Sequence, residues 1–432
     1  MVMALMGPHW LSLLAVVASV VEAGDLPSPD NYRALAGHQV WETEDPQARS
    51  LLAGLEEEGL ADILGHTSSV LRFRVDPEGV SRVSDSLLKA RVDYRVAITD
   101  LESHYVEMER VARRDGVIRA EKISCTSDSC PIPLIEEYME FTEIEWYLKE
   151  LAAQSSRVEL ESIGKSIEGR DIWRVIIRAA QEGEGQRKAV WLEGGLHARE
   201  WISPAVTINL IHKIATDESF LPAGIDVYAV PMANPDGYVY SWTGNRLWRK
   251  NRRRNDGSRC RGVDLNRNWD MKFGVGASSN PCSETYKGVA AFSEPETVAL
   301  SEEMTRVAAG NDLKLMVALH CYGQVLLYPW GWTSDPAPNK DEMIKAGNAF
   351  AKAALKGRGR KYSVANSGSE FYYAAGATDD WAKGKLGTPY SYTLELPDEG
   401  NFGFTLPADR IPFTFEEVKR GIIELIYVVF NE

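Results

Sequence analysis

The sequence predicts a mixed α/β sheet that follows a small α+β unit. Three observations lead to this fold class. From about residue 135 onward, apolar strand-like runs alternate with helix-like segments. Between residues 39 and 114, strands and helices alternate within a unit that is long enough to pack its own core. The chain has 432 residues, of which 44% are hydrophobic and 25% are charged, the composition of an ordinary globular protein.

The α+β unit begins with a short strand and ends with a charged helix. Its expected elements, in the order strand, helix, strand, helix, strand and helix, lie at residues 40–41, 46–57, 69–75, 78–89, 92–98 and 101–114. None of them carries residues that look catalytic. Basic residues follow at Arg113, Arg114, Arg119 and Lys122. In an exposed linker they would be cut by trypsin-like proteases, and the alternative is a plain solvated helix end.

Five apolar runs of the larger unit suit buried strands. They lie at residues 173–177, 189–192, 225–230, 313–319 and 390–396. Helix starts are marked between and after them: Pro204 opens a helix over residues 205–215, and residues 293–296 and 414–417 both fit a capping box. The last helix, which runs to Phe430, is strongly apolar and should lie against the sheet.

The N-terminus has the pattern of a secretory signal. Residues 11–21 form an apolar run, and small residues follow, with Ala23 as the predicted cleavage point. No Lys or Arg precedes the run, which departs from the usual pattern. The run is shorter than the roughly 18 residues that span a membrane. We therefore expect residues 1–23 to be a signal peptide and the protein to be secreted and extracellular, without a membrane anchor.

Five cysteines are present in the chain. In an oxidising compartment Cys260 and Cys282 can close one loop, and Cys125 and Cys130 a small one. Cys321 is then left over beside His320. It is either a reactive thiol or, as we expect, a buried and inert one. The formal net charge of −14 argues against nucleic acid as a partner.

A histidine and a glutamate stand three residues apart after the strand at residues 189–192. His197 and Glu200 both offer atoms that suit zinc, and a catalytic zinc takes three protein ligands. His320, at the end of the strand at 313–319, is the candidate for the third. Both histidines follow predicted strands, where α/β sheets place their sites. Alone, the His-x-x-Glu pattern is weak, because it also describes surface pairs.

A zinc hydrolase also needs a base for the water and positive groups for an oxyanion and a carboxylate. Glu395 lies in an otherwise apolar strand, so it is either a working base or a salt-bridged carboxylate. Residues 246–261 contain eight Lys or Arg and one acid. We expect most of this run to be a solvated loop with one or two Arg turned inward. Arg267 beside Asn266 could clamp a carboxylate.

Four motifs together resemble the zinc carboxypeptidases of the pancreatic A/B type, the B type most of all. They are residues 195–203, 263–270, 319–322 and 393–396, and their order and spacing match over residues 135–432. The resemblance implies an α/β fold with a mixed eight-stranded sheet and helices on both faces. The α+β unit resembles that family's ferredoxin-like activation domain, which covers the active site until it is cleaved off.

This resemblance implies an activation domain with its linker at residues 24–122 and a catalytic domain at residues 123–432. Arg119 and Lys122 are the favoured cleavage sites, because they leave about the expected length before the first catalytic helix. The resemblance also implies a trypsin-like activating protease, a monomer, and a substrate that is the C-terminus of a peptide or protein.

The roles of single residues follow from the same resemblance. One Zn²⁺ would be held by His197, Glu200 and His320, with Glu395 as the general base. Around the substrate, Arg249 would polarise the scissile carbonyl and hold the oxyanion, and Asn266 and Arg267 would bind the terminal carboxylate. Tyr372 would be the mobile side chain that closes over the substrate, and Arg199 and Tyr322 would contact the peptide further out. Cys260 and Cys282 would form the disulfide.

Asp379 decides the expected specificity. In the family this position lies at the base of the side-chain pocket, where an acid accompanies substrates that end in Lys or Arg. A buried carboxylate can pair with a guanidinium, and Phe would leave it unpaired. We therefore expect a zymogen whose enzyme prefers C-terminal Lys and Arg. The alternatives are an A-type preference for aromatic or aliphatic C-termini and a non-catalytic peptide-binding scaffold.

Overall fold

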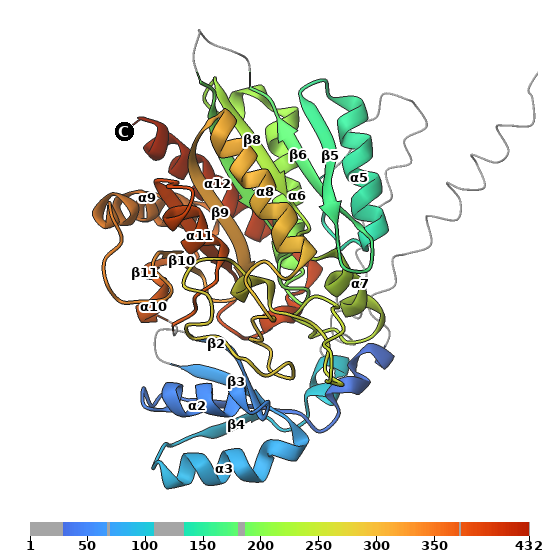
Figure 1. Cartoon of the computed structure of the whole chain (residues 1–432). Coiled ribbons are helices and arrows are strands. Elements are labelled where there is room, and N and C mark those ends of the chain that lie inside the picture. The colour runs from blue at the N-terminus through green and yellow to red at the C-terminus, as the bar shows by residue number, and fades with distance from the viewer. Residues whose placement is uncertain (1–28, 67–69, 108–133, 180–185, 371–372, 432) are drawn as a thin grey trace, which may run out of the picture.

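The computed structural model describes residues 29–66, 70–107, 134–179, 186–370 and 373–431. The small N-terminal unit lies against one end of the larger unit, whose sheet runs through its middle (Figure 1). None of the helices among the described residues is long and apolar enough to cross a membrane. The predicted signal peptide and the basic residues from Arg113 to Lys122 lie outside the described residues.

The N-terminal unit is a four-stranded antiparallel sheet with the strand order β2-β3-β1-β4. Its elements are β1 (Gln39–Thr43), α2 (Ala48–Glu57), β2 (Ala61–His66), β3 (Leu71–Val75), α3 (Val80–Lys89) and β4 (Arg95–Ile98). Its core contains Trp41, Leu52, Phe73 and Val83, which come from both the sheet and the helices. The α+β pattern is present, but the sequence pattern missed β2, whose residues do not alternate clearly.

The larger unit is built on one mixed sheet of eight strands in the order β11-β10-β12-β9-β7-β8-β6-β5, as expected. Its strands are β5 (Val158–Lys165), β6 (Asp171–Ile177), β7 (Lys188–Glu193), β8 (Ile225–Val230), β9 (Asp312–Cys321), β10 (Val325–Tyr328), β11 (Ser363–Asn366) and β12 (Tyr390–Leu396). The four central strands β12, β9, β7 and β8 are parallel, so their carboxyl ends share one edge.

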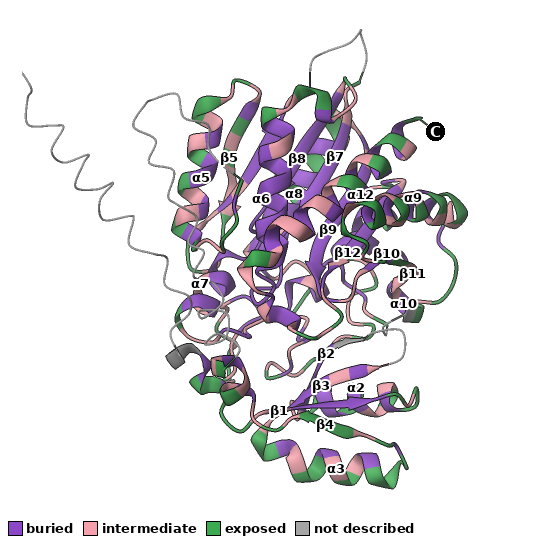
Figure 2. Cartoon of the chain, turned by 180° about the vertical axis from the view of Figure 1, so that it is seen from behind, coloured by how far each residue is buried: buried purple, intermediate pink, exposed green. Residues whose placement is uncertain are grey.

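Helices cover both faces of this sheet, because alternate residues of each central strand point to opposite sides. In β7, Val190 and Leu192 pack into one core while Ala189 and Trp191 pack into the other. The helices are α5 (Phe141–Gln154), α6 (Ile202–Thr216), α9 (Lys340–Arg358) and α12 (Ile411–Asn431) on the first face, and α8 (Pro295–Gly310) and α11 (Thr378–Gly384) on the second. Figures 1 and 2 show these two layers from opposite sides, with the central strands buried between them.

The three predicted helix starts are wrong in detail. Helix α6 begins at Ile202, so Pro204 lies within its first turn, where a missing N–H costs nothing. Helix α8 begins at Pro295 and its N-cap residue makes no side-chain capping bond. Helix α12 begins at Ile411, which places Thr414 inside the helix. Helices α6 and α12 thus begin before their local start signals at Pro204 and Thr414.

Shorter elements connect this frame. They are the 3₁₀ helices η1 (Pro29–Leu35), η2 (Pro77–Gly79), η3 (Glu218–Phe220), η4 (Leu265–Arg267), η5 (Gly403–Thr405) and η6 (Ala408–Arg410), and the short helices α7 (Pro235–Thr243) and α10 (Ser367–Glu370). The carboxyl ends of β7, β9 and β12 meet at the edge of the sheet that faces the N-terminal unit, and strand β2 lies nearest to it (Figure 1).

Candidate active site

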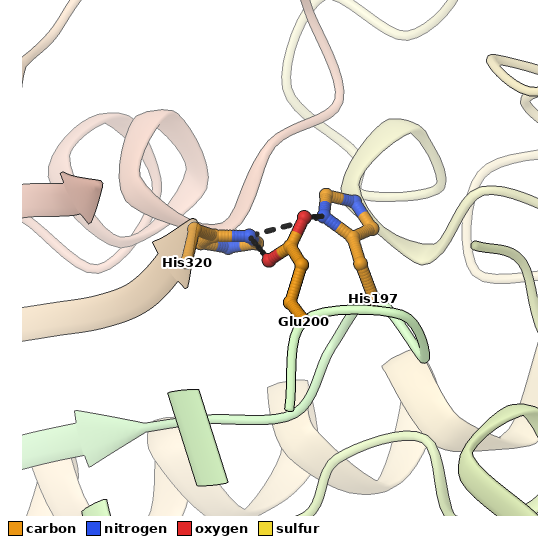
Figure 3. A group of neighbouring side chains, drawn as sticks. All are labelled: His197, Glu200 and His320. Atoms are coloured by element: carbon orange, nitrogen blue, oxygen red, sulfur yellow. Dashed lines mark hydrogen bonds and ion pairs between the residues drawn. The ribbon is translucent and has the colours of Figure 1, made fainter. Parts of the chain in front are cut away.

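Three buried side chains converge at the carboxyl ends of β7 and β9. Two of them, His197 and Glu200, come from the loop and the turn between β7 and α6, and His320 comes from the end of β9. The Nδ1 atom of His197 lies 2.8 Å from Glu200 Oε1, and His320 Nδ1 lies 3.0 Å from Glu200 Oε2. The two Nδ1 atoms are 3.1 Å apart, so all three side chains point to one place (Figure 3).

A zinc ion fits this set of donors. Tetrahedral zinc with bonds of about 2.0–2.1 Å places its ligand atoms about 3.3 Å apart, close to the separations seen here. Burial lowers the pKa of His197, which favours the neutral ring that a metal requires. Within the described ranges, we looked for His, Cys, Asp and Glu side chains whose ligand atoms lie close enough together to hold one metal ion. His197, Glu200 and His320 form such a group.

Asp264 holds the groups around this centre in place. Its Oδ1 atom lies 3.1 Å from His197 Nε2, so the far nitrogen of that ring faces a carboxylate, as is usual for a metal-binding histidine. The guanidinium of Arg249 donates to Asp264 Oδ2 at 2.9 Å. Although burial acts in the opposite direction, Arg249 and His197 hold the pKa of the Asp264 carboxyl well below its usual range. The charged carboxylate of Asp264 therefore links His197, one of the three metal ligands, to Arg249.

A cavity of about 110 Å³ opens beside the three ligands. The predicted residues Arg249, Asn266, Arg267, Tyr322, Asp379 and Glu395 all line it. Glu395 is opposite His320 in the pairing of β12 with β9, which places its carboxylate beside the metal ligands. Burial raises the pKa of Glu395 to about 8, and a cation at the ligands would lower it again. A carboxylate with such a pKa suits proton transfer near neutral pH.

The two residues proposed for carboxylate binding lie in the short helix η4. The Asn266 N–H donates to Asp264 Oδ1 at 2.9 Å, and its side-chain oxygen accepts from the N–H of Thr378 at 3.1 Å. That second bond leaves the amide N–H groups of Asn266 for a ligand. The guanidinium of Arg267 is 4.0 Å from Asp264 and bonds to its neighbouring carbonyl at 2.9 Å. Both side chains are therefore oriented by Asp264 and its surroundings.

Asp379 is the second residue of helix α11 and lines the same cavity. It is 3% exposed, and its Oδ1 accepts from the N–H of Asp380 at 2.9 Å, while the hydroxyl of Thr393 also bonds to it. Burial raises the pKa of the Asp379 carboxyl. Asp380 instead accepts two bonds from the N–H of Gly331, at 2.9 and 3.0 Å. Asp379 thus lies in the cavity wall, whereas the Asp380 carboxylate is bonded to the backbone of Gly331.

The N-terminal unit contributes residues to the wall of the cavity. Ile63 and Leu64 of β2 line it, and Asp62 Oδ2 accepts from the guanidinium of Arg199 at 2.8 Å. Both partners are buried, and although burial acts in the opposite direction, Arg199 and Arg74 hold the pKa of Asp62 below its usual value. Arg199 is thus held by the N-terminal unit rather than directed into the cavity.

The remaining predictions have mixed outcomes. The disulfide between Cys260 and Cys282 is confirmed, with the sulfur atoms 2.10 Å apart. Cys321 is free and buried, and burial raises the pKa of its thiol well above the usual value, which favours the inert interpretation. Tyr372, and the Cys125 and Cys130 pair, lie outside the described residues.

Sequence reasoning missed two site residues, Asp264 and Asp62. The motif at residues 263–270 contains Asp264, and a carboxylate beside a predicted histidine ligand was the available signal. Asp62 offered no signal, because it lies in an unrecognised strand of another unit.

Removal of the metal is expected to destabilise the protein. Zinc at about 1,000 times its dissociation constant adds about 4 kcal/mol to the free energy of unfolding. Thermal unfolding with and without a chelator measures this difference. The variant His197→Ala should lose the effect of the chelator, while His104→Ala, a histidine of the N-terminal unit, should keep it. Identical melting temperatures with and without chelator in the unaltered chain would contradict the metal site.

Known proteins share this architecture and much of the sequence. The zinc carboxypeptidase family model matches residues 144–421. Carboxypeptidase A4 of Mus musculus is 39% identical over 346 residues, which cover 78% of this chain and 79% of that protein. Carboxypeptidase B of Astacus astacus is 35% identical over 291 residues, which cover 66% and 94%. The crystal structure of carboxypeptidase A from Helicoverpa armigera superposes with a TM-score of 0.82 at 27% identity, covering 91% of this chain and 98% of that one.

The family match covers well over half of the chain and includes all three metal-binding side chains. The eight-stranded mixed sheet with helices on both faces is the carboxypeptidase-like fold expected from the four motifs. Hence the chain belongs to the zinc carboxypeptidase family, and it is a peptide hydrolase with one catalytic zinc ion.

Proposed function

We propose that this chain is the secreted zymogen of a carboxypeptidase that removes Lys and Arg from peptide C-termini. The observation that carries this B-type preference is the buried carboxylate of Asp379 in the cavity wall. No ion pair to Asp379 is found within the described parts of the chain, so a cationic substrate side chain would supply its partner. An aromatic substrate would leave the carboxylate buried and unpaired, at a cost of roughly 2–5 kcal/mol.

The last residue of the substrate would be bound at two groups, its terminal carboxylate and its side chain. Its terminal carboxylate would accept hydrogen bonds from Asn266 and Arg267, while its side chain would extend toward Asp379. The guanidinium of Arg267 suits carboxylate binding, because its parallel N–H groups match the two oxygens of a carboxylate. An internal peptide bond offers no carboxylate at that point, which explains why the enzyme would act only at C-termini. Tyr372 would close over the bound residue, and Arg199 and Tyr322 would contact the peptide further out.

The chemistry would be shared between the metal centre and two side chains. When bound by His197, Glu200 and His320, zinc supplies Lewis-acid chemistry, which lowers the pKa of water and polarises a carbonyl. Arg249, held by Asp264, would donate hydrogen bonds to the oxygen of the scissile carbonyl as negative charge develops there. Glu395 would take the proton from the attacking water and deliver it to the leaving amine.

The N-terminal unit would keep this enzyme inactive. Support comes from strand β2, whose Ile63 and Leu64 lie in the wall of the cavity. Asp62 pairs with Arg199, a predicted substrate contact, and Arg74 of β3 lies 3.7 Å from Glu284 of the larger unit. A peptide could not reach the ligands without displacing these residues. Release would follow cleavage by a trypsin-like protease after Arg119 or Lys122.

The proposed division of the chain is a signal peptide at 1–23, an activation segment at 24–122 and a catalytic domain at 123–432. Secretion is supported by the apolar run and small-residue site at the N-terminus and by the Cys260–Cys282 disulfide. We expect the activated enzyme to act as a monomer, because the predicted site is complete within one chain.

Two short peptides test the function, one ending in Arg and one in Phe. Each is incubated with the intact chain and with trypsin-treated chain, with and without a zinc chelator. We expect release of Arg only after trypsin treatment, and complete inhibition by the chelator. Preferred release of Phe would discard the role of Asp379. Equal activity before and after trypsin would discard the zymogen.

A single substitution tests the inhibitory contact more directly. Asp62→Asn removes the charge that pairs with Arg199, and loss of one partner from such a buried pair costs roughly 2–5 kcal/mol. We expect the intact Asp62→Asn chain to hydrolyse the Arg peptide before trypsin is added, or to be activated faster. The control is Asp85→Asn, an exposed residue of α3. If both variants remain as inactive as the unaltered chain, the Asp62 contact does not inhibit.

A further inference from the structure

The hairpin at residues 251–262 is strongly basic, and the proposed chemistry uses none of it. It contains five arginines and one acid, Asp256, in a chain whose formal net charge is −14. Arg254 and Arg261 form an antiparallel bridge across the hairpin. The disulfide of Cys260 fastens it to a loop later in the chain. The arginines therefore lie on a braced turn.

Alternate residues of this hairpin point to opposite sides. Arg253 points toward the body of the larger unit, because its guanidinium donates to buried Glu294 at 2.6 Å, and Cys260 is held there by its disulfide. In an extended pair of segments, the neighbours of these residues face the other way. This alternation places four arginines on the outer side, two of them exposed (Arg254 and Arg259) and two partly exposed (Arg252 and Arg261). We call these four side chains the outer arginines.

The outer arginines repel one another and have no neutralising acid. Bridge partners lie about 4.5–5.5 Å apart at Cα, and like charges placed opposite each other are destabilising. Burial lowers the pKa of Arg252, and the charge of Arg261 lowers it further, so these two guanidiniums are also near each other. Within the described ranges, none of the outer arginines forms an ion pair. Glu168 and Asp236, the acids that act on Arg252, already pair with Arg170.

Aromatic rings hold one of the outer arginines in place. The guanidinium of Arg252 lies 3.5 Å from the ring centre of Tyr240 and 4.4 Å from that of Trp248. Such stacking occupies the flat faces of a guanidinium and leaves the N–H groups at its edge for an oxyanion. The side chain is therefore oriented before any ligand binds, which lowers the entropic cost of binding.

The composition of the hairpin favours one class of partner. Residues 251–262 contain no large apolar side chain, whereas protein partners and membrane surfaces are usually bound through aromatic or aliphatic anchors. Guanidiniums instead pair with the oxygens of anionic groups through two parallel N–H groups. A sulfated polysaccharide presents such groups at short intervals along one chain, and it is a molecule of the extracellular space.

We infer that the outer arginines form a binding surface for a sulfated polysaccharide. The inference takes secretion from the proposed function, but it does not depend on the peptide specificity. The net charge of −14 gives no long-range attraction to a polyanion, so binding must come from local contacts with the outer arginines. A short polysaccharide should therefore bind nearly as well as a long one.

Calorimetric titration of the intact chain with a heparin hexasaccharide at several salt concentrations tests this surface. The variant Arg254→Gln/Arg261→Gln is compared with the unaltered chain. We expect its dissociation constant to rise about 10-fold or more, because charge-assisted hydrogen bonds are lost. Each lost contact to a linear polyanion also lowers the slope of log affinity against log salt by about one, so this slope should fall by about two.

The matched control is Lys352→Gln/Lys356→Gln, which removes the same charge from exposed positions of α9 and should change neither quantity. If the arginine variant folds poorly, Arg259→Gln alone should lower the slope by about one. Release of Arg from peptides by the trypsin-treated arginine variants should be unchanged, because the outer arginines are not among the residues that line the cavity. The binding test therefore stands or fails independently of the peptide specificity.

Three results would overturn the inference. The first is no binding of the hexasaccharide by the unaltered chain, and the second is equal binding by the arginine variant and the lysine control. The third is tighter binding of a poly-glutamate peptide, or of phosphatidylserine vesicles, than of the hexasaccharide. That third result would assign the outer arginines to an acidic protein segment or to a membrane instead.

Discussion

Glu395→Gln is expected to lower kcat of the activated enzyme by about 10²–10⁴-fold, the usual contribution of a general base. The substitution keeps the size and shape of the side chain but removes its capacity to take a proton. KM should change little, because Glu395 is proposed to act on the water and the leaving group rather than on the bound peptide. Steady-state kinetics with the Arg peptide measures both constants.

The stability of this variant separates chemistry from folding. Glu395 lies in β12 beside His320, and burial already disfavours its charged form. A neutral amide should therefore leave the melting temperature unchanged or raise it. Glu399→Gln, four residues further on and exposed, is the control and should keep full kcat. If Glu395→Gln retained kcat, another group would have to be the base.

Asp379→Ile is expected to reverse the specificity of the enzyme. Release of Arg should fall by about 30-fold to several thousand-fold, which corresponds to loss of a buried charge pair worth roughly 2–5 kcal/mol. Release of Phe should rise, because an aromatic ring would no longer face a buried carboxylate. The measurement is kcat/KM for the Arg and Phe peptides with trypsin-treated protein.

The control for this substitution is Asp270→Asn. Asp270 is a 57% exposed carboxylate that pairs with Lys385 on the surface, and its loss should change neither peptide. If Asp379→Ile kept the same ratio of Arg to Phe hydrolysis as the unaltered enzyme, the carboxylate would not face the substrate side chain. The preference would then have to come from another part of the cavity.

The central strands of the larger sheet could be predicted because they are covered on both faces. Strands β7, β8 and β9 are apolar along most of their length, so their pattern needs no knowledge of the partner strands. Strands β5 and β11 lie at the edges of the sheet and carry polar residues, and β10 has only four residues. Their existence depends on pairing with strands distant in sequence, which local patterns do not reveal.

The metal site was predictable for a related reason. His197 and His320 each follow a recognisable strand, and parallel strands bring their carboxyl ends together at one edge. The contacts that orient the site were not predictable in this way. Asp62, for example, reaches Arg199 from a separate unit. Such meetings are set by the packing of whole elements rather than by spacing along the chain.

The most direct test of the account is the order in which residues leave one peptide. A peptide ending in Phe-Lys-Arg is incubated with trypsin-treated protein whose residual trypsin has been inhibited, and its mass is followed over time. We predict loss of Arg, then loss of Lys, and a halt when Phe becomes the C-terminal residue. Cleavage at an internal bond, or no loss from this peptide while a Phe-ended peptide is shortened, would contradict it.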